Sequence, residues 1–480
     1  MQSVCAKIFI IAIDQLGGLE VSRFRDLLDD ITGGKYSPVK RMSSARIIAA
    51  GYLILILIGT CLLMLPFASK DEPPSFADAM FTATSASCVT GLIVYDTFSQ
   101  WTVFGQIVLI ILIQIGGMGF MTIISLAALA TGRKIGLKER SVLSESVNNP
   151  ELGGIIRMVK KIATGTFICE GIGALLLSTR FIPKMGLLQG IGNSAFLAIS
   201  AFCNAGFDLN GKYGAYSSLC EFRSDPVVNI TACLLILSGG IGFMVWDDIV
   251  KYKLKFRSYR LHSKIALSMT AALTLIGTAL FFIFEHNNTA AGLGFGEELL
   301  LAFFNSVTPR TAGFNTVDTA ALSPASTILT IFYMFIGGSP GSTAGGVKTV
   351  TVAVLFLAAV ASMRNDEDIN LFGRRLEEDM PKKALSVAAF SLTLTVIGVT
   401  AICGIQPELD PTDVVFEAVS AINTVGMTTG ITRDLNSISR IIIMLMMYCG
   451  RVGSVSFALI FTNTKRYSGV RNPEETISVG

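Results

Sequence analysis

Four glycines that follow short, mildly apolar segments are the residues whose spacing suggests chemistry in this sequence. Each glycine has a phenylalanine ten residues before it and an apolar residue directly after it. Glycine adopts the positive φ angle that lets a chain leave a short helix and turn back. The segments read FTATSASCVTGL, FLAISAFCNAGF, FFNSVTPRTAGF and FEAVSAINTVGM, and their glycines are Gly91, Gly206, Gly313 and Gly426. We therefore expect four re-entrant segments whose backbone carbonyl groups can replace the water shell of a cation.

The residues between each phenylalanine and its glycine also repeat. Alanine stands eight residues before the glycine, and serine six residues before it, in the first, second and fourth segments. The third segment has Asn305 and Val307 at these two positions. Glycines that merely relieve helix packing are the alternative explanation, but packing alone does not require three residue types at fixed offsets. The four centres lie 107 to 115 residues apart, so each repeat has room for a helix, a re-entrant loop and a second helix.

The composition indicates that these repeats lie in a membrane. Hydrophobic residues make up 51% of the 480 positions and charged residues 15%, whereas soluble domains carry about 25% charged residues. The nine cysteines and two histidines show no spacing typical of a disulfide framework or a metal site. Apolar runs of about 20 residues cross a bilayer core. Eight runs are candidate spanning helices, near 46–66, 102–131, 157–179, 226–250, 263–284, 324–361, 383–405 and 438–463.

The fold class that follows is an all-α membrane protein of four tandem helix–pore loop–helix repeats, with eight spanning helices and four re-entrant pore helices around a pseudo-fourfold ion pathway. The re-entrant stretches are 75–90, 189–205, 297–312 and 411–425. The expected divisions are a cytoplasmic N-terminal segment, four repeats (the third with an interrupted second helix) and a cytoplasmic tail: 1–45, 46–131, 157–250, 263–361, 383–463 and 464–480. Basic loops alternate with acidic ones, so we expect both termini in the cytoplasm and the chain in the cell (inner) membrane.

A glycine-rich run, GGSPGSTAGGVKT from Gly337 to Thr349, interrupts the sixth of these spans. The apolar pieces on either side are each too short to cross a membrane, so the break falls near its middle. Irregular backbone at this depth lines a cavity, and below four re-entrant segments it could obstruct the pathway. A kink caused by Pro340 and the glycines is the alternative. The run is not a nucleotide-binding P-loop, because Val347 separates the last glycine from Lys348 and no strand precedes it.

Three charged residues fall at or near the expected membrane depth. Arg451 lies in the last span, where it could bond the carbonyl groups of residues 337–346 and stabilise a closed state, or form a structural ion pair. Arg310 lies beside the third glycine, where a charge facing the axis would oppose cation entry. We expect its side chain to turn away, toward an acid such as Asp318. Glu170 lies within a span, and the sequence identifies no partner for it.

The four glycine segments resemble the selectivity filters of the Trk/Ktr/HKT superfamily of potassium transporters. The resemblance covers about residues 45–465 and includes GGMGF at 116–120, GGIGF at 239–243, the glycine-rich run and GRVGS at 450–454. No further amino-terminal helix pair is present, so the chain is most similar to the KtrB membrane subunit. The resemblance implies potassium as the substrate, a homodimer with one pathway per subunit, and a cytoplasmic nucleotide-binding regulatory ring of the KtrA/TrkA kind. It implies no nucleic-acid partner and no covalent cofactor.

The resemblance also assigns residues to two sites. Gly91 is glycine where sodium-transporting plant members of the superfamily have serine, which favours potassium. The potassium filter would consist of Val89, Thr90, Gly91, Asn204, Ala205, Gly206, Thr311, Ala312, Gly313, Thr424, Val425 and Gly426. The intramembrane gate would consist of Gly337, Gly338, Ser339, Pro340, Gly341, Ser342, Thr343, Ala344, Gly345, Gly346, Lys348 and Arg451.

Two transport mechanisms remain open. The first is a gated, channel-like potassium uptake subunit. The alternative is a sodium- or proton-coupled potassium symporter with the same filter, in which sodium is an activator or a coupled ion. A membrane enzyme is not expected, because the chain has no HExxH pair and no catalytic Cys–His arrangement. The basic loops at 133–161 and 251–264 would dock the regulator, although anionic lipid headgroups would attract the same residues.

Overall fold

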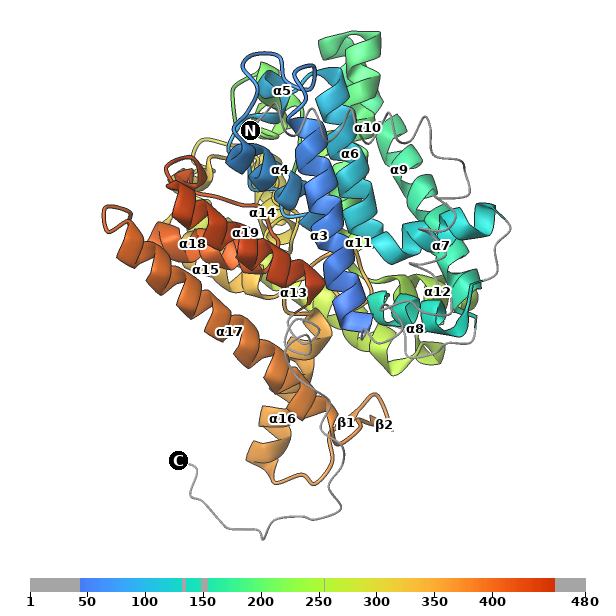
Figure 1. The fold of residues 1–480 in the computed structure, drawn as a ribbon. Coiled ribbons are helices and arrows are strands. Elements are labelled where there is room, and N and C mark those ends of the chain that lie inside the picture. The colour runs from blue at the N-terminus through green and yellow to red at the C-terminus, as the bar shows by residue number, and fades with distance from the viewer. Residues whose placement is uncertain (1–43, 132–134, 148–153, 254, 454–480) are drawn as a thin grey trace.

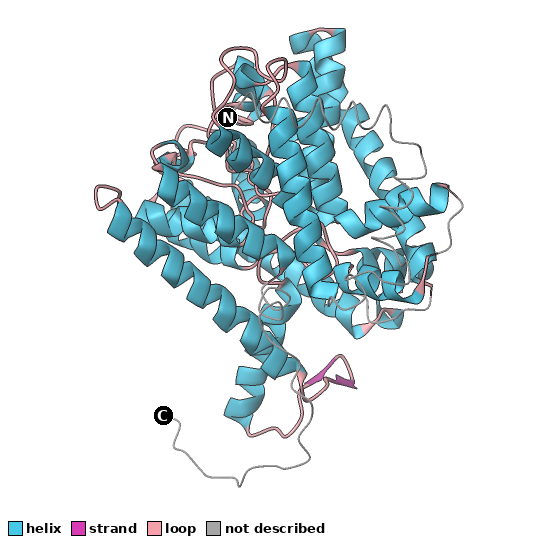
Figure 2. Ribbon diagram, viewed as in Figure 1, coloured by secondary structure: helices cyan, strands magenta, loops and turns pink. Residues whose placement is uncertain are grey.

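The computed structural model describes residues 44–131, 135–147, 154–253 and 255–453. These residues are predominantly helical, as expected (Figure 2), and the strands in this part of the chain form one short antiparallel pair, β1 (Asn370–Leu371) and β2 (Arg374–Arg375). The expected N-terminal segment and cytoplasmic tail lie almost wholly outside the described residues. Figure 1 shows α16 (Thr349–Arg364) and one end of α17 (Met380–Ile405) projecting from the main helical body beside this strand pair.

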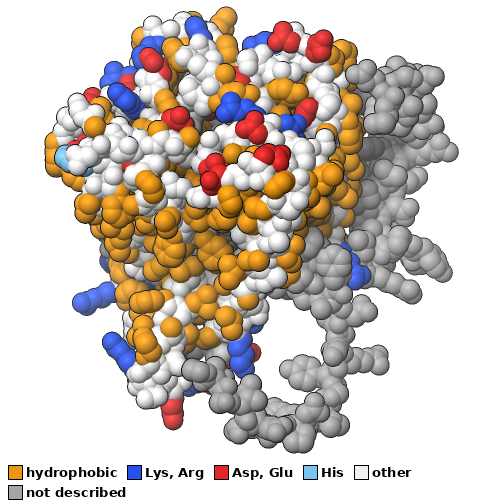
Figure 3. Space-filling view, turned by 90° about the vertical axis from the view of Figure 1, so that its left-hand side faces the viewer, with side chains coloured by type: hydrophobic (Ala, Val, Ile, Leu, Met, Phe, Trp, Pro, Cys, Tyr) orange, Lys and Arg blue, Asp and Glu red, His pale blue; other side chains and the backbone are white. Residues whose placement is uncertain are grey.

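Four long helices are apolar enough to cross a membrane. Their surfaces carry exposed large hydrophobic side chains, among them Leu53, Leu175 and Leu275. Figure 3 shows apolar side chains covering the middle of one face, with acidic and basic side chains gathered toward its upper end. Such a surface suits lipid rather than water, so this is a membrane protein. The four helices are α3 (Ser44–Leu63), α9 (Ile155–Met185), α13 (Leu261–Glu285) and α17.

A shorter helix follows each long helix and packs against it. These helices are α4 (Phe76–Cys88), α10 (Leu187–Cys203), α14 (Phe295–Val307) and α18 (Pro411–Ile422). The Ser75 and Asp410 side chains cap α4 and α18 by accepting hydrogen bonds from backbone N–H groups of the first turn. Each short helix ends just before one of the four glycines, so the fold places those glycines at four equivalent helix ends.

The second helix of the first two repeats, expected as one spanning helix over 102–131 and over 226–250, is in each case divided in two by a bend. In the first repeat α6 (Val103–Met118) turns by 96° into α7 (Phe120–Ala130). In the second, α11 (Pro226–Gly240) turns by 99° into α12 (Phe243–Tyr252). Gly119 and Gly242 stand at the bends with φ angles of 81° and 94°, a conformation that side chains disfavour.

The other two second helices are not bent in this way. In the third repeat α15 (Pro324–Phe335) and α16 are separated by residues 336–348, where the sequence predicts an interruption, and Ile336 pairs with Val347 across the break. In the fourth, α19 (Ser437–Val452) reaches almost to the end of the described residues. Up to six of the eight expected spans therefore meet a length and hydropathy criterion for crossing a membrane, if each bent pair counts as one.

Short elements complete the loops and join the repeats. Asp78 on α4 pairs with Arg440 on α19 at 2.6 Å, which connects the first repeat to the fourth. The remaining helices among the described residues are α5 (Thr97–Gln100), α8 (Leu137–Ser146), η2 (Asn210–Lys212), η3 (Cys220–Phe222), η4 (Phe256–Ser258), η5 (Thr319–Ala321) and η6 (Ile431–Arg433).

Candidate functional site

The four glycines lie in a closed ring. A methyl group added to Gly91 would lie 2.6 Å from the carbonyl oxygen of Ala205, and one added to Gly206 would lie 3.0 Å from that of Ala312. The same substitution at the third glycine would meet the carbonyl oxygen of Val425, and at the fourth that of Thr90. Each glycine thus faces the residue that precedes the next glycine, so segments more than 100 residues apart surround one axis and leave no room for a side chain there.

The backbone of the four segments repeats the same unusual conformation. The glycines have φ angles of 100°, 69°, 78° and 89°. Two residues before them stand Val89, Asn204, Thr311 and Thr424, whose φ angles of 58°, 60°, 74° and 50° are also positive. Residues other than glycine rarely adopt positive φ angles. Those that do cluster at functional sites, where the surrounding structure holds the backbone in this conformation. Because the same pair of positive φ angles recurs in all four segments, we consider the segments a candidate functional site.

The recurring serines explain how three of these segments are held. The Ser85 and Ser420 hydroxyl oxygens accept hydrogen bonds from the N–H groups of Gly91 and Gly426 at 3.0 and 3.1 Å. Ser200 accepts from the N–H of Phe207 at 3.0 Å. The third repeat has valine at this position, and Thr308, the residue directly after α14, takes the place of the serine. The hydroxyl of Thr308 donates to the carbonyl of Phe314 at 2.5 Å, so the outlying segment is supported through a different backbone group.

Glycines on the second helices let those helices approach the inner ends of the short helices. A side chain at Gly116 would collide with the carbonyl oxygen of Ser87, and one at Gly239 with that of Phe202. Gly450 stands in the same relation to Ile422. These glycines belong to the GGMGF, GGIGF and GRVGS sequences, so the motifs fix the distance between the second helix and the ring segment in the first, second and fourth repeats.

The glycine-rich loop at residues 337–346 is bonded to the second and fourth repeats. The N–H groups of Ser339 and Thr343 donate to the carbonyls of Gly240 and Gly239 at 2.8 and 3.3 Å. The Thr343 hydroxyl also donates to the carbonyl of Phe202, at the end of α10, at 3.1 Å. The side chain of Asn423, which ends α18, accepts from the N–H of Val347 at 3.3 Å. The loop therefore contacts two of the short helices that carry the ring.

Two cationic side chains bind the carbonyl groups of this loop. Arg451 donates from Nη1 to the Thr343 carbonyl at 2.5 Å, and its Nη2 donates to Gly116 on α6. Lys348 donates to the carbonyls of Ala344 and Gly345 at 2.5 and 3.1 Å. A cavity of about 330 Å³ adjoins the loop and both cations. These bonds hold the loop in one position.

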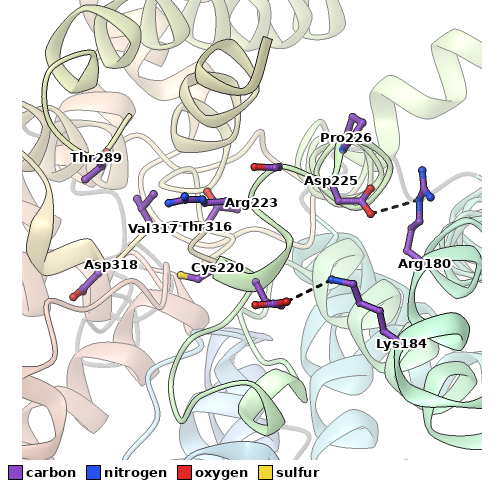
Figure 4. A pocket seen from close by; sticks show the side chains of 12 residues that line it. Arg180, Lys184, Cys220, Arg223, Asp225, Pro226, Thr289, Thr316, Val317 and Asp318 are labelled. Atoms are coloured by element: carbon purple, nitrogen blue, oxygen red, sulfur yellow. Dashed lines mark ion pairs between the residues drawn. The ribbon is translucent and has the colours of Figure 1, made fainter. Parts of the chain in front are cut away.

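A second, larger cavity in the described part of the chain lies away from the ring. It measures about 910 Å³ and lies between the end of α9, the start of α11 and residues 316–318 (Figure 4). Its charges are largely paired. Arg180 lies 3.5 Å from Asp225, and Lys184 lies 3.6 Å from Glu221. None of the ring residues lines this pocket. We therefore do not assign it to the ion pathway, although it is large.

Two charged residues have partners that the sequence did not identify. Arg310 does turn away from the axis, but it lies against Thr270 and Thr274 of α13. The expectation of Asp318 as its partner is therefore wrong. The Glu170 carboxylate accepts a hydrogen bond from the Gln114 side chain at 3.0 Å. Both contacts join helices that are far apart in sequence, which hydropathy does not specify.

Acidic groups lie beyond the ring, on the face that the charge pattern predicts to be external. Asp208 follows the second glycine by two residues, and its carboxylate accepts from the N–H of Asn210 at 2.9 Å. Burial raises the pKa of this carboxyl from 3.8 to about 6; the Asn210 bond lowers the pKa, and the negative charge of Asp96 raises it. Asp208 therefore gains or loses its charge at mildly acidic pH, which the sequence did not predict.

Comparisons with known proteins match nearly the whole chain. Residues 32–467 match the family TrkH, described as cation transport protein. The chain is 41% identical over 449 residues to the potassium/sodium uptake protein NtpJ of Enterococcus hirae, which covers 92% of this chain and 98% of that protein. It is 39% identical over 442 residues to the Ktr system potassium uptake protein B of Bacillus subtilis, covering 92% and 97%.

A solved structure has the same fold. The potassium transporter TrkH from Vibrio parahaemolyticus superposes with a TM-score of 0.72 over 96% of both chains, at 15% identity. At this identity the likeness concerns the fold alone. The matched family and the two relatives are transporters, not enzymes.

Proposed function

The chain belongs to the TrkH family of cation transport proteins, and from this premise we propose that it takes up potassium across the cell membrane through the ring of four glycines. The observation that carries the proposal is the ring itself. Four backbone segments meet there without side chains, each glycine facing the carbonyl oxygen of the next segment. Such an array offers a cation only neutral oxygens, which can replace its water shell without binding it too tightly to leave.

Each segment supplies oxygens at several levels. The glycine and the two residues before it form a filter of twelve residues, with the same alternation of positive φ angles in every repeat. Serine or threonine hydroxyls form hydrogen bonds with the backbone of each segment. Because these bonds fix the backbone, its carbonyl oxygens keep a defined spacing. A size-matched cage of this kind favours potassium over the smaller sodium ion, which it contacts less well.

The loop at residues 337–346 is the gate in this proposal. Arg451 and Lys348 hold its carbonyl groups while it is bonded to α10 and α18, which is the closed state. Opening requires these contacts to break, so an outside source of free energy is needed. A cytoplasmic nucleotide-binding ring of the KtrA/TrkA kind would supply it, since the curated relatives include a Ktr system subunit. The active form would be a homodimer with a pathway in each subunit and both termini in the cytoplasm.

A coupled symporter is the second candidate. The name of one relative joins potassium with sodium, as a potassium/sodium uptake protein. In this version the same ring conducts potassium only together with sodium or a proton, and sodium acts as activator or coupled ion.

Potassium flux into liposomes that contain the purified protein tests the proposal. We expect uptake driven by a potassium gradient alone, and lower potassium-over-sodium preference in the Gly91→Ser variant. Gly171→Ser is the matched control, because nothing lies within 4 Å of the added atom. A strict requirement for a sodium or proton gradient would select the symporter. Unchanged preference in folded Gly91→Ser protein would contradict the filter.

A further inference from the structure

Arg310 is a buried cation directly behind the third ring segment. Its side chain is 5% exposed. The Nη1 atom donates to the Thr270 carbonyl and the Thr274 hydroxyl at 3.4 and 3.3 Å, and Nη2 donates to the Thr270 hydroxyl at 3.2 Å. These are long contacts to neutral groups, and Nε has no partner in the described part of the chain. The guanidinium is held in place while its charge is left uncompensated.

The absence of a counter-ion is unusual for such a group. No carboxylate among the described residues lies within ion-pair distance of Arg310, whereas the partly buried Arg440 pairs with Asp78 at 2.6 Å. A buried charge without a partner opposes folding, and ionisable groups at membrane depth tend to serve function. Packing alone would be served better by an uncharged residue.

The other three repeats are uncharged at the equivalent position. Three residues before the glycine stand Cys88, Cys203 and Asn423 in the first, second and fourth segments. Among the four equivalent positions, only the one in the third segment therefore carries a charge. Arg310 is two residues from Ala312, so its backbone lies within about 7 Å of a residue of the ring. A charge this close and this poorly screened acts on any cation bound there.

We propose that Arg310 is a positioning residue that sets how tightly the ring holds cations, by placing a fixed positive charge beside the pathway without touching the ion. This inference rests on the proposed function. The charge lowers the affinity of the ring and speeds the release of the ion. Electrostatic repulsion depends on charge and not on ion size, so it weakens potassium and sodium binding by the same factor and leaves their ratio to the carbonyl cage.

The size of the effect follows for an assumed separation of about 10 Å between the guanidinium and the ion. A unit charge about 10 Å from a bound cation, at an effective dielectric constant of about 20, changes its affinity roughly tenfold. Removing the charge should therefore lower the half-saturating concentration for potassium by this factor and reduce the maximal flux, because release becomes slower. Arg310→Gln keeps a donor for the α13 threonines and loses only the charge.

The test measures concentration dependence of potassium and sodium flux in liposomes for the parent protein, Arg310→Gln, Arg310→Met and Arg310→Lys. We expect both ions to bind roughly tenfold more tightly in the Gln and Met variants, with their ratio unchanged, and Lys to restore most of the parent affinity. Arg180→Gln, which removes an arginine from the distant pocket of Figure 4, is the control for net charge and should behave like the parent.

Two results would overturn the inference while leaving the proposed function intact. Lost potassium preference in all three Arg310 variants without tighter binding would mean that the residue only supports the backbone. Parent-like affinities in the Gln variant would mean that the charge does not reach the ion. If the parent protein itself failed to conduct potassium, the proposed function would fall instead. Should Met prevent folding, the comparison of Gln with Lys still decides the question.

Discussion

Arg451→Gln should open the pathway in the absence of any regulator, by an amount that the structure allows us to work out. Arg451 donates to the Thr343 carbonyl of the loop at 2.5 Å and to Gly116 and Gly117 of α6. Of these bonds, only the one to Thr343 joins the arginine to the proposed gating loop, so only that bond would be lost on opening. A hydrogen bond to a charged group contributes about 1.5–3 kcal/mol, which corresponds to a roughly 10- to 100-fold change in the ratio of open to closed protein.

A second substitution, which removes a weaker hydrogen bond of the same loop, provides a comparison for the size of the effect. Thr343→Val removes the bond from the threonine hydroxyl to the Phe202 carbonyl, a neutral pair at 3.1 Å. Such a bond contributes about 1 kcal/mol, so the open fraction should rise about fivefold. The two values predict an order of effects, with the arginine variant larger than the valine variant.

The assay is basal potassium flux in liposomes with purified protein and no partner subunit. Gly171→Ser serves as control, since the added atom meets nothing within 4 Å. Folding is checked by thermal unfolding of each variant. Reduced flux in well-folded Arg451→Gln protein, or a larger rise in Thr343→Val than in Arg451→Gln, would refute the reasoning that these bonds hold the loop closed.

Three further predictions concern the ring and the expected outer face. Ser85→Ala should lower potassium-over-sodium preference and destabilise the protein by about 1–3 kcal/mol, because the Gly91 N–H loses its acceptor. The control is Ser87→Ala: the Ser87 hydroxyl has no partner in the described structure, so this variant should unfold at the temperature of the parent. Because the Asp208 pKa is raised to about 6, its charge is present above pH 6 and lost below it. Potassium affinity should fall roughly fivefold from pH 7.5 to 5, and persistence of this fall in Asp208→Asn would exclude Asp208 as its source. Glu417, 0% exposed on α18 and bonded to Thr432 at 2.5 Å, is a buried acid near the fourth segment. At alkaline pH, where this carboxyl group is ionised, Glu417→Gln should weaken binding of both cations, opposite in sign to Arg310→Gln, and tighter binding would contradict the electrostatic argument.

The sequence predicted the features that depend on local backbone chemistry. A glycine at the end of a short apolar segment requires a positive φ angle, and the structure has one at Gly91 and its three counterparts. The serine six residues earlier is predictable as part of the pattern, but its purpose becomes clear only when its oxygen is seen to accept from Gly91 N–H. The interruption at residues 336–348 was also predictable, because glycine and proline gather there.

Features that depend on distant contacts were not predictable. The bends at Gly119 and Gly242 fall inside uninterrupted apolar runs, where hydropathy continues unchanged through the turn. The direction of the Arg310 side chain depends on threonines of α13, about 40 residues earlier in the chain. The altered pKa of Asp208 depends on its burial and on Asp96 from another repeat. Each of these is set by tertiary packing, which one sequence without its fold does not reveal.

The location of the bound ion tests the central claim most directly. Crystals of the protein grown with rubidium or thallium, which replace potassium and scatter anomalously, would show where the cation lies. The account predicts anomalous density on the axis of the ring, coordinated by the carbonyl oxygens of Thr90, Ala205, Ala312 and Val425. Well-ordered crystals with no density in the ring, and density only at a site away from the four glycines, would contradict it.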